Sequence, residues 1–261
     1  MNIARLRAIV LLVSVGTANA AGATEIRIYC TGATAAAVRA IAADFSSQTG
    51  DHPSFIVGQP ATIESDLAAG GNADVVLLPA PALATLKASG AMRAGSAVDV
   101  ARVGIGVVVR SGAPRPDISN AAAIRRLLLD AHSVVYSDPA TGGGSAGRAI
   151  AVMIERMGIT KAVKPKLMLV HAIGGGVDLV AVGKAEVGFF NISEILPVQG
   201  AALVGPLPAE LQTYIVFDAA ITAGAAAPAA AASFIKMLAA PAERPAWQKA
   251  GLEPLGSARA E

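Results

Sequence analysis

A glycine-rich stretch between an apolar run and a helical pattern constrains this chain most strongly. Residues 138–148 read DPATGGGSAGR; the apolar run Ser133–Tyr136 precedes them, and a helical pattern runs from Arg148 to Met157. Glycine allows the backbone to approach a ligand closely, and the first turn of a helix presents unpaired N–H groups with partial positive charge. The stretch predicts an anion-binding turn, although an ordinary strand-to-helix loop has the same composition. The candidate contacts are Gly144, Ser145 and Arg148, whose guanidinium could pair with a carboxylate.

The same order of strand, small-residue loop and helix recurs along the chain. Predicted strands at Glu25–Cys30, Pro53–Val57 and Asp74–Leu78 alternate with helical patterns at Ala35–Gln48, Ala61–Ala69 and Pro81–Ser89. Later, Leu167–Val170 leads through three glycines to a helical pattern at Val177–Val182, and Glu186–Phe190 leads to a short helix opened by Asn191. Alternating strands and helices predict parallel sheets with helices on their faces.

Two long extended stretches are predicted to connect two halves of the chain. The valine-rich run Ala101–Arg110 is expected to be one strand that carries the chain from one lobe to the other, and Leu211–Ile221 is expected to lead back. Between them, a helix is expected at Ile118–Ala131, with Asp117 or Ser119 near its N-terminal cap.

The first 23 residues are predicted to be a secretory signal peptide. Two arginines precede the short apolar run Ala8–Val15, and small residues at A-x-A spacing follow it, so that cleavage after Ala20 or Ala23 fits equally well. The run is short for a bilayer span; a buried N-terminal helix is the alternative. We therefore expect a periplasmic protein that has no membrane association after cleavage.

The composition argues against several functional classes. The 261 residues carry a formal net charge of +2 and are only 4% aromatic, without a basic run that would bind nucleic acid. Cys30 is the only cysteine, so no internal disulfide can form, and a buried structural role is favoured for it. The three histidines, His52, His132 and His171, show no zinc-type spacing, so neither a metal nor a cofactor is indicated.

Several segments resemble the periplasmic solute-binding proteins of the molybdate-binding type. They are Gly71–Leu78, with the sequence GNADVVLL, the run Val103–Ser119, and the tail from Ala232 to Pro254. The resemblance covers nearly the whole mature chain. It implies an α/β two-lobe fold of periplasmic-binding-protein type II, with parallel-dominated sheets, flanking helices and a two-strand hinge near residues 103–109 and 214–221. The implied lobes are 24–104 plus 220–261, and 105–219, in a monomer.

The resemblance also implies ligand residues, with two departures from the family pattern. The first loop, Thr31–Thr34, stands where the family holds hydroxyl and backbone donors. Gln59 replaces the usual Ser-Gly pair, and Asn191 follows the strand where molybdate binders often have a tyrosine. These longer amides suit a larger planar anion better than a tetrahedral oxyanion. The expected ligand contacts are Thr31, Gly32, Ala33, Gln59, Thr62, Gly144, Ser145, Arg148, Gly175 and Asn191.

Two functions of different classes follow from this resemblance. Some proteins that resemble molybdate binders are periplasmic aconitate isomerases, which interconvert the cis and trans forms of a tricarboxylate by an allylic proton shift. Such chemistry needs a general base, and His171 is the candidate because it ends a strand just before a glycine triplet; a surface histidine is the alternative. The second function is a carrier that delivers molybdate, another small oxyanion or an organic acid to an ABC-transporter permease. The enzyme is narrowly favoured.

Overall fold

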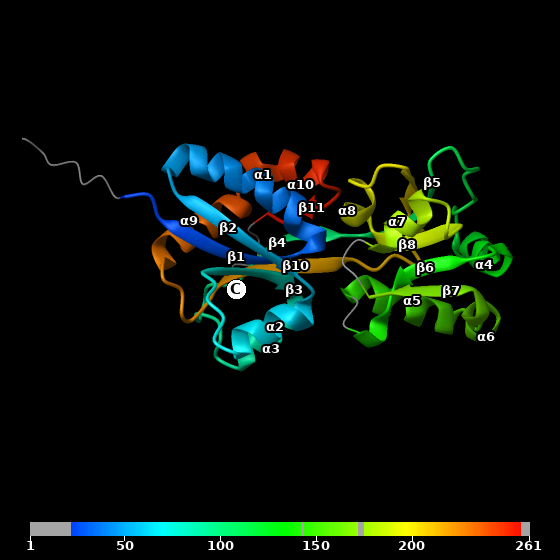
Figure 1. Cartoon of the computed structure of the whole chain (residues 1–261), viewed down its shortest axis with the longest axis horizontal. Coiled ribbons are helices and arrows are strands. Elements are labelled where there is room, and N and C mark those ends of the chain that lie inside the picture. The colour runs from blue at the N-terminus through cyan, green and yellow to red at the C-terminus, as the bar shows by residue number, and fades with distance from the viewer. Residues whose placement is uncertain (1–21, 142–143, 172–174, 257–261) are drawn as a thin grey trace, which may run out of the picture.

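Two lobes, each built on one β-sheet, make up the chain (Figure 1). The computed structural model describes residues 22–141, 144–171 and 175–256. The predicted signal peptide lies outside these residues, except for Gly22 and Ala23, which are exposed. Within the described ranges, no helix is both long and apolar enough to cross a membrane.

The first sheet has the strand order β11-β4-β10-β3-β1-β2. Strands β2, β1 and β3 run parallel, whereas β10 runs antiparallel to β3 and β4, and β11 antiparallel to β4. The strands are β1 (Glu25–Thr31), β2 (His52–Gly58), β3 (Val75–Pro79), β4 (Val98–Val103), β10 (Ile215–Ile221) and β11 (Glu253–Pro254). The helices are α1 (Gly32–Thr49), α2 (Pro60–Ala68), α3 (Ala80–Ala88), α9 (Pro228–Leu238) and α10 (Arg244–Lys249), with a 3₁₀ turn at Pro241–Glu243. Helices α1 and α10 cover one face of this sheet, and α2 and α3 the other (Figure 1).

The second sheet has the order β7-β6-β8-β5-β9. Strands β7, β6 and β8 are parallel, and β5 is antiparallel to both β8 and β9. The strands are β5 (Ile105–Arg110), β6 (Val134–Ser137), β7 (Leu167–Val170), β8 (Val187–Asn191) and β9 (Ala201–Pro206). The helices are α4 (Ala121–Asp130), α5 (Gly144–Arg156), α6 (Thr160–Val163), α7 (Gly175–Ala181) and α8 (Ile192–Ile195), with 3₁₀ turns at Pro139–Thr141 and Lys164–Lys166.

The two-lobe α/β architecture predicted from the sequence is confirmed, with three differences in detail. Both sheets are mixed, because β10 in the first sheet and β5 in the second run antiparallel to the strands on either side of them. The single strand expected at Ala101–Arg110 is two strands. Strand β4 ends at Val103 and pairs in the first sheet, whereas β5 begins at Ile105 and pairs in the second. Helix α4 is capped by Asn120, whose side chain accepts from the N–H of Ala123 at 2.9 Å, and not by Asp117 or Ser119.

The chain crosses between the sheets at Gly104 and again in segment 207–214. Gln212 ties the two crossings together: its Oε1 accepts from the Ile105 N–H at 2.9 Å, and its Nε2 donates to the Ile105 carbonyl at 3.0 Å. The lobe boundaries expected from the sequence remain a proposal; the second of them, at residues 219 and 220, falls within β10, which pairs with β3 and β4.

Candidate anion-binding site between the lobes

A small pocket lies where three loops of the first lobe meet β8 and α8 of the second. Its volume of about 30 Å³ corresponds to roughly two water molecules. Because β1, β2 and β3 are parallel, their carboxyl ends share one edge of the sheet, which is where open α/β sheets bind ligands. The lining residues are Thr31, Gly32, Ala33, Gln59, Pro60, Pro79, Asn191, Glu194, Ile215 and Phe217.

The first lobe contributes polar groups that its own helices do not use. Thr31 is the N-terminal cap residue of α1 but makes no side-chain cap hydrogen bond, and its buried Oγ1 has no partner among the residues described. Gln59 caps α2 without a side-chain hydrogen bond, and Pro60 begins that helix. The first N–H groups of α1, an 18-residue helix, have no carbonyl of their own helix to bond. A hydroxyl, an amide and a helix start therefore converge as neutral donors for an anion.

The second lobe contributes Asn191 and Glu194. Asn191 is 8% exposed; its Nδ2 donates to Glu194 Oε2 at 3.1 Å, while its buried Oδ1 has no partner in the described part of the chain. Burial raises the pKa of the Glu194 carboxyl from 4.5 to about 7, against the opposing effect of the hydrogen bonds from Asn191. Because no lysine or arginine belongs to the described lining, the pocket is close to neutral when Glu194 is protonated.

The structure brings five of the expected contacts together and leaves others apart. Thr31, Gly32, Ala33, Gln59 and Asn191 all line the pocket, whereas Thr62 is exposed on α2 and does not.

Three further expected contacts stand at helix starts of the second lobe. Gly144 and Ser145 begin α5, and Gly175 begins α7; their side-chain surroundings lie outside the described residues. Because β6, β7 and β8 are parallel, α5 and α7 start at the same sheet edge as Asn191. Helix α5 approaches β6 closely, since a Cβ on Gly147 would lie 2.1 Å from the Ser137 carbonyl oxygen.

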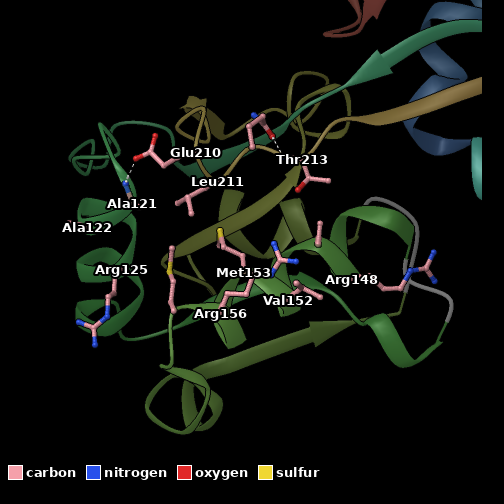
Figure 2. Close-up of a pocket in the computed structure, with 13 residues that line it drawn as sticks. Ala121, Ala122, Arg125, Arg148, Val152, Met153, Arg156, Glu210, Leu211 and Thr213 are labelled. Atoms are coloured by element: carbon pink, nitrogen blue, oxygen red, sulfur yellow. Dashed lines mark hydrogen bonds between the residues drawn. The ribbon is translucent and has the colours of Figure 1, made fainter.

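Arg148 lies in a different pocket, of about 610 Å³, between α4, α5 and segment 210–213. Figure 2 shows Arg125 and Arg148 at opposite ends of this pocket, so their guanidinium groups do not converge on one point. Arg148 is exposed. The described geometry therefore does not join Arg148 to the pocket around Thr31 and Asn191.

His171 directly follows β7 and contacts a carboxylate. Its Nδ1 lies 3.4 Å from Asp138 Oδ2, with the histidine side chain 64% exposed and that of Asp138 13% exposed. Asp138 also accepts from the Ala140 N–H at 2.8 Å, as expected for a residue that caps the turn. A histidine oriented by a carboxylate is a common general base, but His171 does not line the small pocket.

Cys30 is fully buried, and burial raises the pKa of its thiol to about 11, so it is an inert core residue. A cluster of three or more His, Cys, Asp or Glu side chains that could hold a metal is absent from the described residues.

Glu194 is the ionisable residue of the described pocket lining, and sequence reasoning missed it. Its signal was the spacing Asn-Ile-Ser-Glu, which resembles a capping box and directs the carboxyl back towards the first residue of the motif. An acidic residue in the first turn of a helix is usually explained by its favourable interaction with the helix dipole. For that reason the sequence alone did not suggest that Glu194 lines a pocket.

Comparisons with known proteins agree with this architecture. Residues 26–253 match the family model described as bacterial extracellular solute-binding protein. An aconitate isomerase from Pseudomonas sp. is 32% identical over 250 residues, which cover 94% of each chain.

Solved structures show the same fold at low sequence identity. The periplasmic molybdate-binding protein of Azotobacter vinelandii superposes with a TM-score of 0.71 at 19% identity, covering 87% of this chain and 98% of that one. The substrate-binding domain of a putative molybdenum ABC transporter from Clostridium difficile gives 0.72 at 12% identity, covering 89% and 100%. The resemblance predicted from the sequence is thereby confirmed, and the chain belongs to the bacterial extracellular solute-binding protein family.

Proposed function

We propose that this protein binds a small polycarboxylate between its lobes and isomerises it, interconverting the cis and trans forms of an aconitate-like substrate. The observation that carries the proposal is the 32% identity to an aconitate isomerase over 94% of both chains. The pocket supports it, because a carboxylate bound there could accept hydrogen bonds from the amides of Gln59 and Asn191 and from the hydroxyl of Thr31.

The reaction requires binding groups for several carboxylates and one group that moves a proton. The start of α1 supplies N–H donors beside the pocket, and the starts of α5 and α7 supply more at the facing edge. Arg148, in the second turn of α5, remains a candidate partner for an outer carboxylate. His171, held by Asp138, is the candidate general base predicted from the sequence, and its 3.4 Å contact with that carboxylate favours the role.

Proton NMR of the purified protein with cis-aconitate in heavy water tests the proposal. We expect trans-aconitate signals to grow, with deuterium entering the substrate if the proton exchanges with solvent. If His171 is the base, His171→Ala should bind substrate without turning it over. Folded wild-type protein that leaves cis-aconitate unchanged over hours would remove the isomerase function.

A carrier is the second candidate, favoured by the pocket's neutral donors and its fold. Neutral hydrogen-bond donors and helix starts can hold a small oxyanion without a compensating cation. In that case the partner is an ABC-transporter permease, and the ligand is molybdate, another oxyanion or an organic acid. Thermal-shift screening of molybdate, sulfate and organic acids distinguishes the two: a carrier is stabilised by its ligand but consumes none of it.

The family description and the basic, apolar N-terminus together support a periplasmic location, reached through cleavage of residues 1–23. We also propose that the mature protein acts as a monomer. Mass spectrometry of the exported protein, and light scattering, test these two points.

A further inference from the structure

We propose that Glu194, rather than His171, is the catalytic residue of this isomerase that moves the proton: its carboxylate lines the pocket, where His171 does not, and carries the proton between the two allylic carbons of the bound substrate. The inference rests on the proposed function, and it assumes that the reacting carbons of the substrate enter the pocket formed by Thr31, Gln59 and Asn191.

The surroundings of Glu194 are those of a reactive acid rather than a structural one. Its side chain lines the pocket, is partly buried, and receives a hydrogen bond from the neutral Asn191 amide at 3.1 Å. Among the ion pairs of the described residues none includes Glu194, in contrast to Glu253, which pairs with Arg102 at 2.6 Å. A carboxyl withdrawn from water without a cation is destabilised in its charged form, a cost that a purely structural acid would avoid.

A single carboxylate can complete an allylic shift without any co-reactant. Ionised Glu194 takes a proton from the methylene carbon: the C–H bond breaks, an O–H bond forms, and the electron pair spreads over the allylic carbons and the conjugated carboxylate. The same O–H group then delivers its proton, or a deuteron gained by exchange with heavy water, to the other allylic carbon, and Glu194 is again ionised. Because burial brings the pKa of Glu194 to about 7, both of its forms are populated near neutral pH, which suits a proton carrier.

Asn191 is the positioning partner of this carboxylate. Its Nδ2 donates to Oε2 at 3.1 Å, and its backbone also hydrogen-bonds the carboxyl, so Asn191 fixes the orientation of Glu194 in the pocket. Since Asn191 ends β8 and Glu194 lies in α8, both residues are held by the second lobe, facing Thr31 and Gln59 of the first. A ligand held between the lobes would therefore contact Thr31 and Gln59 of the first lobe and Glu194 of the second.

The test follows C–H cleavage directly. Exchange of substrate hydrogen for deuterium, and cis–trans conversion, are measured by proton NMR in heavy water for the wild type, Glu194→Gln and Glu194→Ala. Glu155→Gln, in an exposed position on α5, is the matched control. Binding of trans-aconitate to each protein is measured by calorimetry. We expect both rates to fall about 10²–10⁴-fold in the two Glu194 variants while affinity changes by less than about tenfold, with the control unchanged.

Chemical rescue separates proton transfer from a structural role. Added formate should restore part of the exchange to Glu194→Ala, because it can occupy the space of the missing carboxylate, and should not accelerate Glu194→Gln. If the wild type turns over substrate and the Glu194 variants keep rates within about threefold of the wild-type rate, the Glu194 assignment alone is overturned. Loss of binding together with loss of rate, without rescue, would assign Glu194 to the shape of the pocket and overturn it as well. A folded wild type without turnover would instead remove the proposed function itself.

Discussion

Replacing Glu194 with glutamine should stabilise the ligand-free protein at alkaline pH. The substitution keeps the shape of the side chain and its ability to bond Asn191, but removes the ionisation. In the wild type the carboxyl titrates near pH 7 when folded and near 4.5 when unfolded, because burial disfavours its charged form. Below pH 4.5 the group is protonated in both states, and the protein is free of the cost of burying its charge.

The sign and size of the effect follow from proton linkage. Between pH 4.5 and about 7 the folded state retains a proton that the unfolded state has lost, so the free energy of unfolding of the wild type falls as pH rises. The full shift corresponds to roughly 3 kcal/mol. Because Glu194 retains some exposure, solvent reduces the effect, and we expect about 1–3 kcal/mol, or roughly 2–10 °C in Tm.

Thermal unfolding of ligand-free protein between pH 5 and pH 8 measures this difference. Glu194→Gln should differ least from the wild type at pH 5, and its Tm should exceed that of the wild type by most at pH 8. Glu155→Gln, on the exposed surface of α5, is the control for removing one negative charge and should follow the wild type throughout. A Tm difference between wild type and Glu194→Gln that is the same at pH 5 and pH 8 would refute the reasoning.

Three further predictions concern single contacts. Thr31→Val should leave the Tm nearly unchanged, because Oγ1 has no described partner to lose, but should weaken trans-aconitate binding by about 1–3 kcal/mol in calorimetry; an unchanged affinity would remove Thr31 from the site. Gln212→Ala should lower the free energy of unfolding in urea by about 1–3 kcal/mol, since it breaks two bonds to Ile105 at the crossing. Asp74→Ala should lower the free energy of unfolding by about 3 kcal/mol in the same assay, because the buried Asp74 carboxylate accepts from the N–H groups of Arg27 and Ala227 at 2.9 Å each. For Gln212→Ala or Asp74→Ala, a decrease in the free energy of unfolding smaller than the error of the assay would contradict the prediction.

Local periodicity predicted most of the elements that build the two lobes. The strand at Glu25–Cys30 and the helix at Pro228–Leu238 appear within a residue or two of their expected ends, because apolar alternation and helical spacing are local properties of the chain. Strand direction is not local. Whether Ala101–Arg110 forms one strand or two depends on β10 and β8, partners far along the chain, and only the structure shows these pairings.

The site was predictable as a set of loops but not as a set of contacts. The resemblance to solute-binding proteins pointed to Thr31, Gln59 and Asn191, and these residues line one pocket because the carboxyl ends of β1 and β2 in the first sheet lie close to that of β8 in the second. Which long side chains turn into that edge depends on tertiary packing. Arg148 emerges on another surface, and Glu194, one turn into a short helix, enters the pocket.

Calorimetric titration of trans-aconitate, with molybdate as competitor, tests most directly whether the pocket lined by Thr31, Gln59 and Asn191 binds a polycarboxylate. We predict that trans-aconitate binds the wild type, that Gln59→Ala and Asn191→Ala weaken this binding roughly tenfold or more, and that molybdate does not displace it. Tight molybdate binding that excludes trans-aconitate, with affinities unchanged in both variants, would contradict the account.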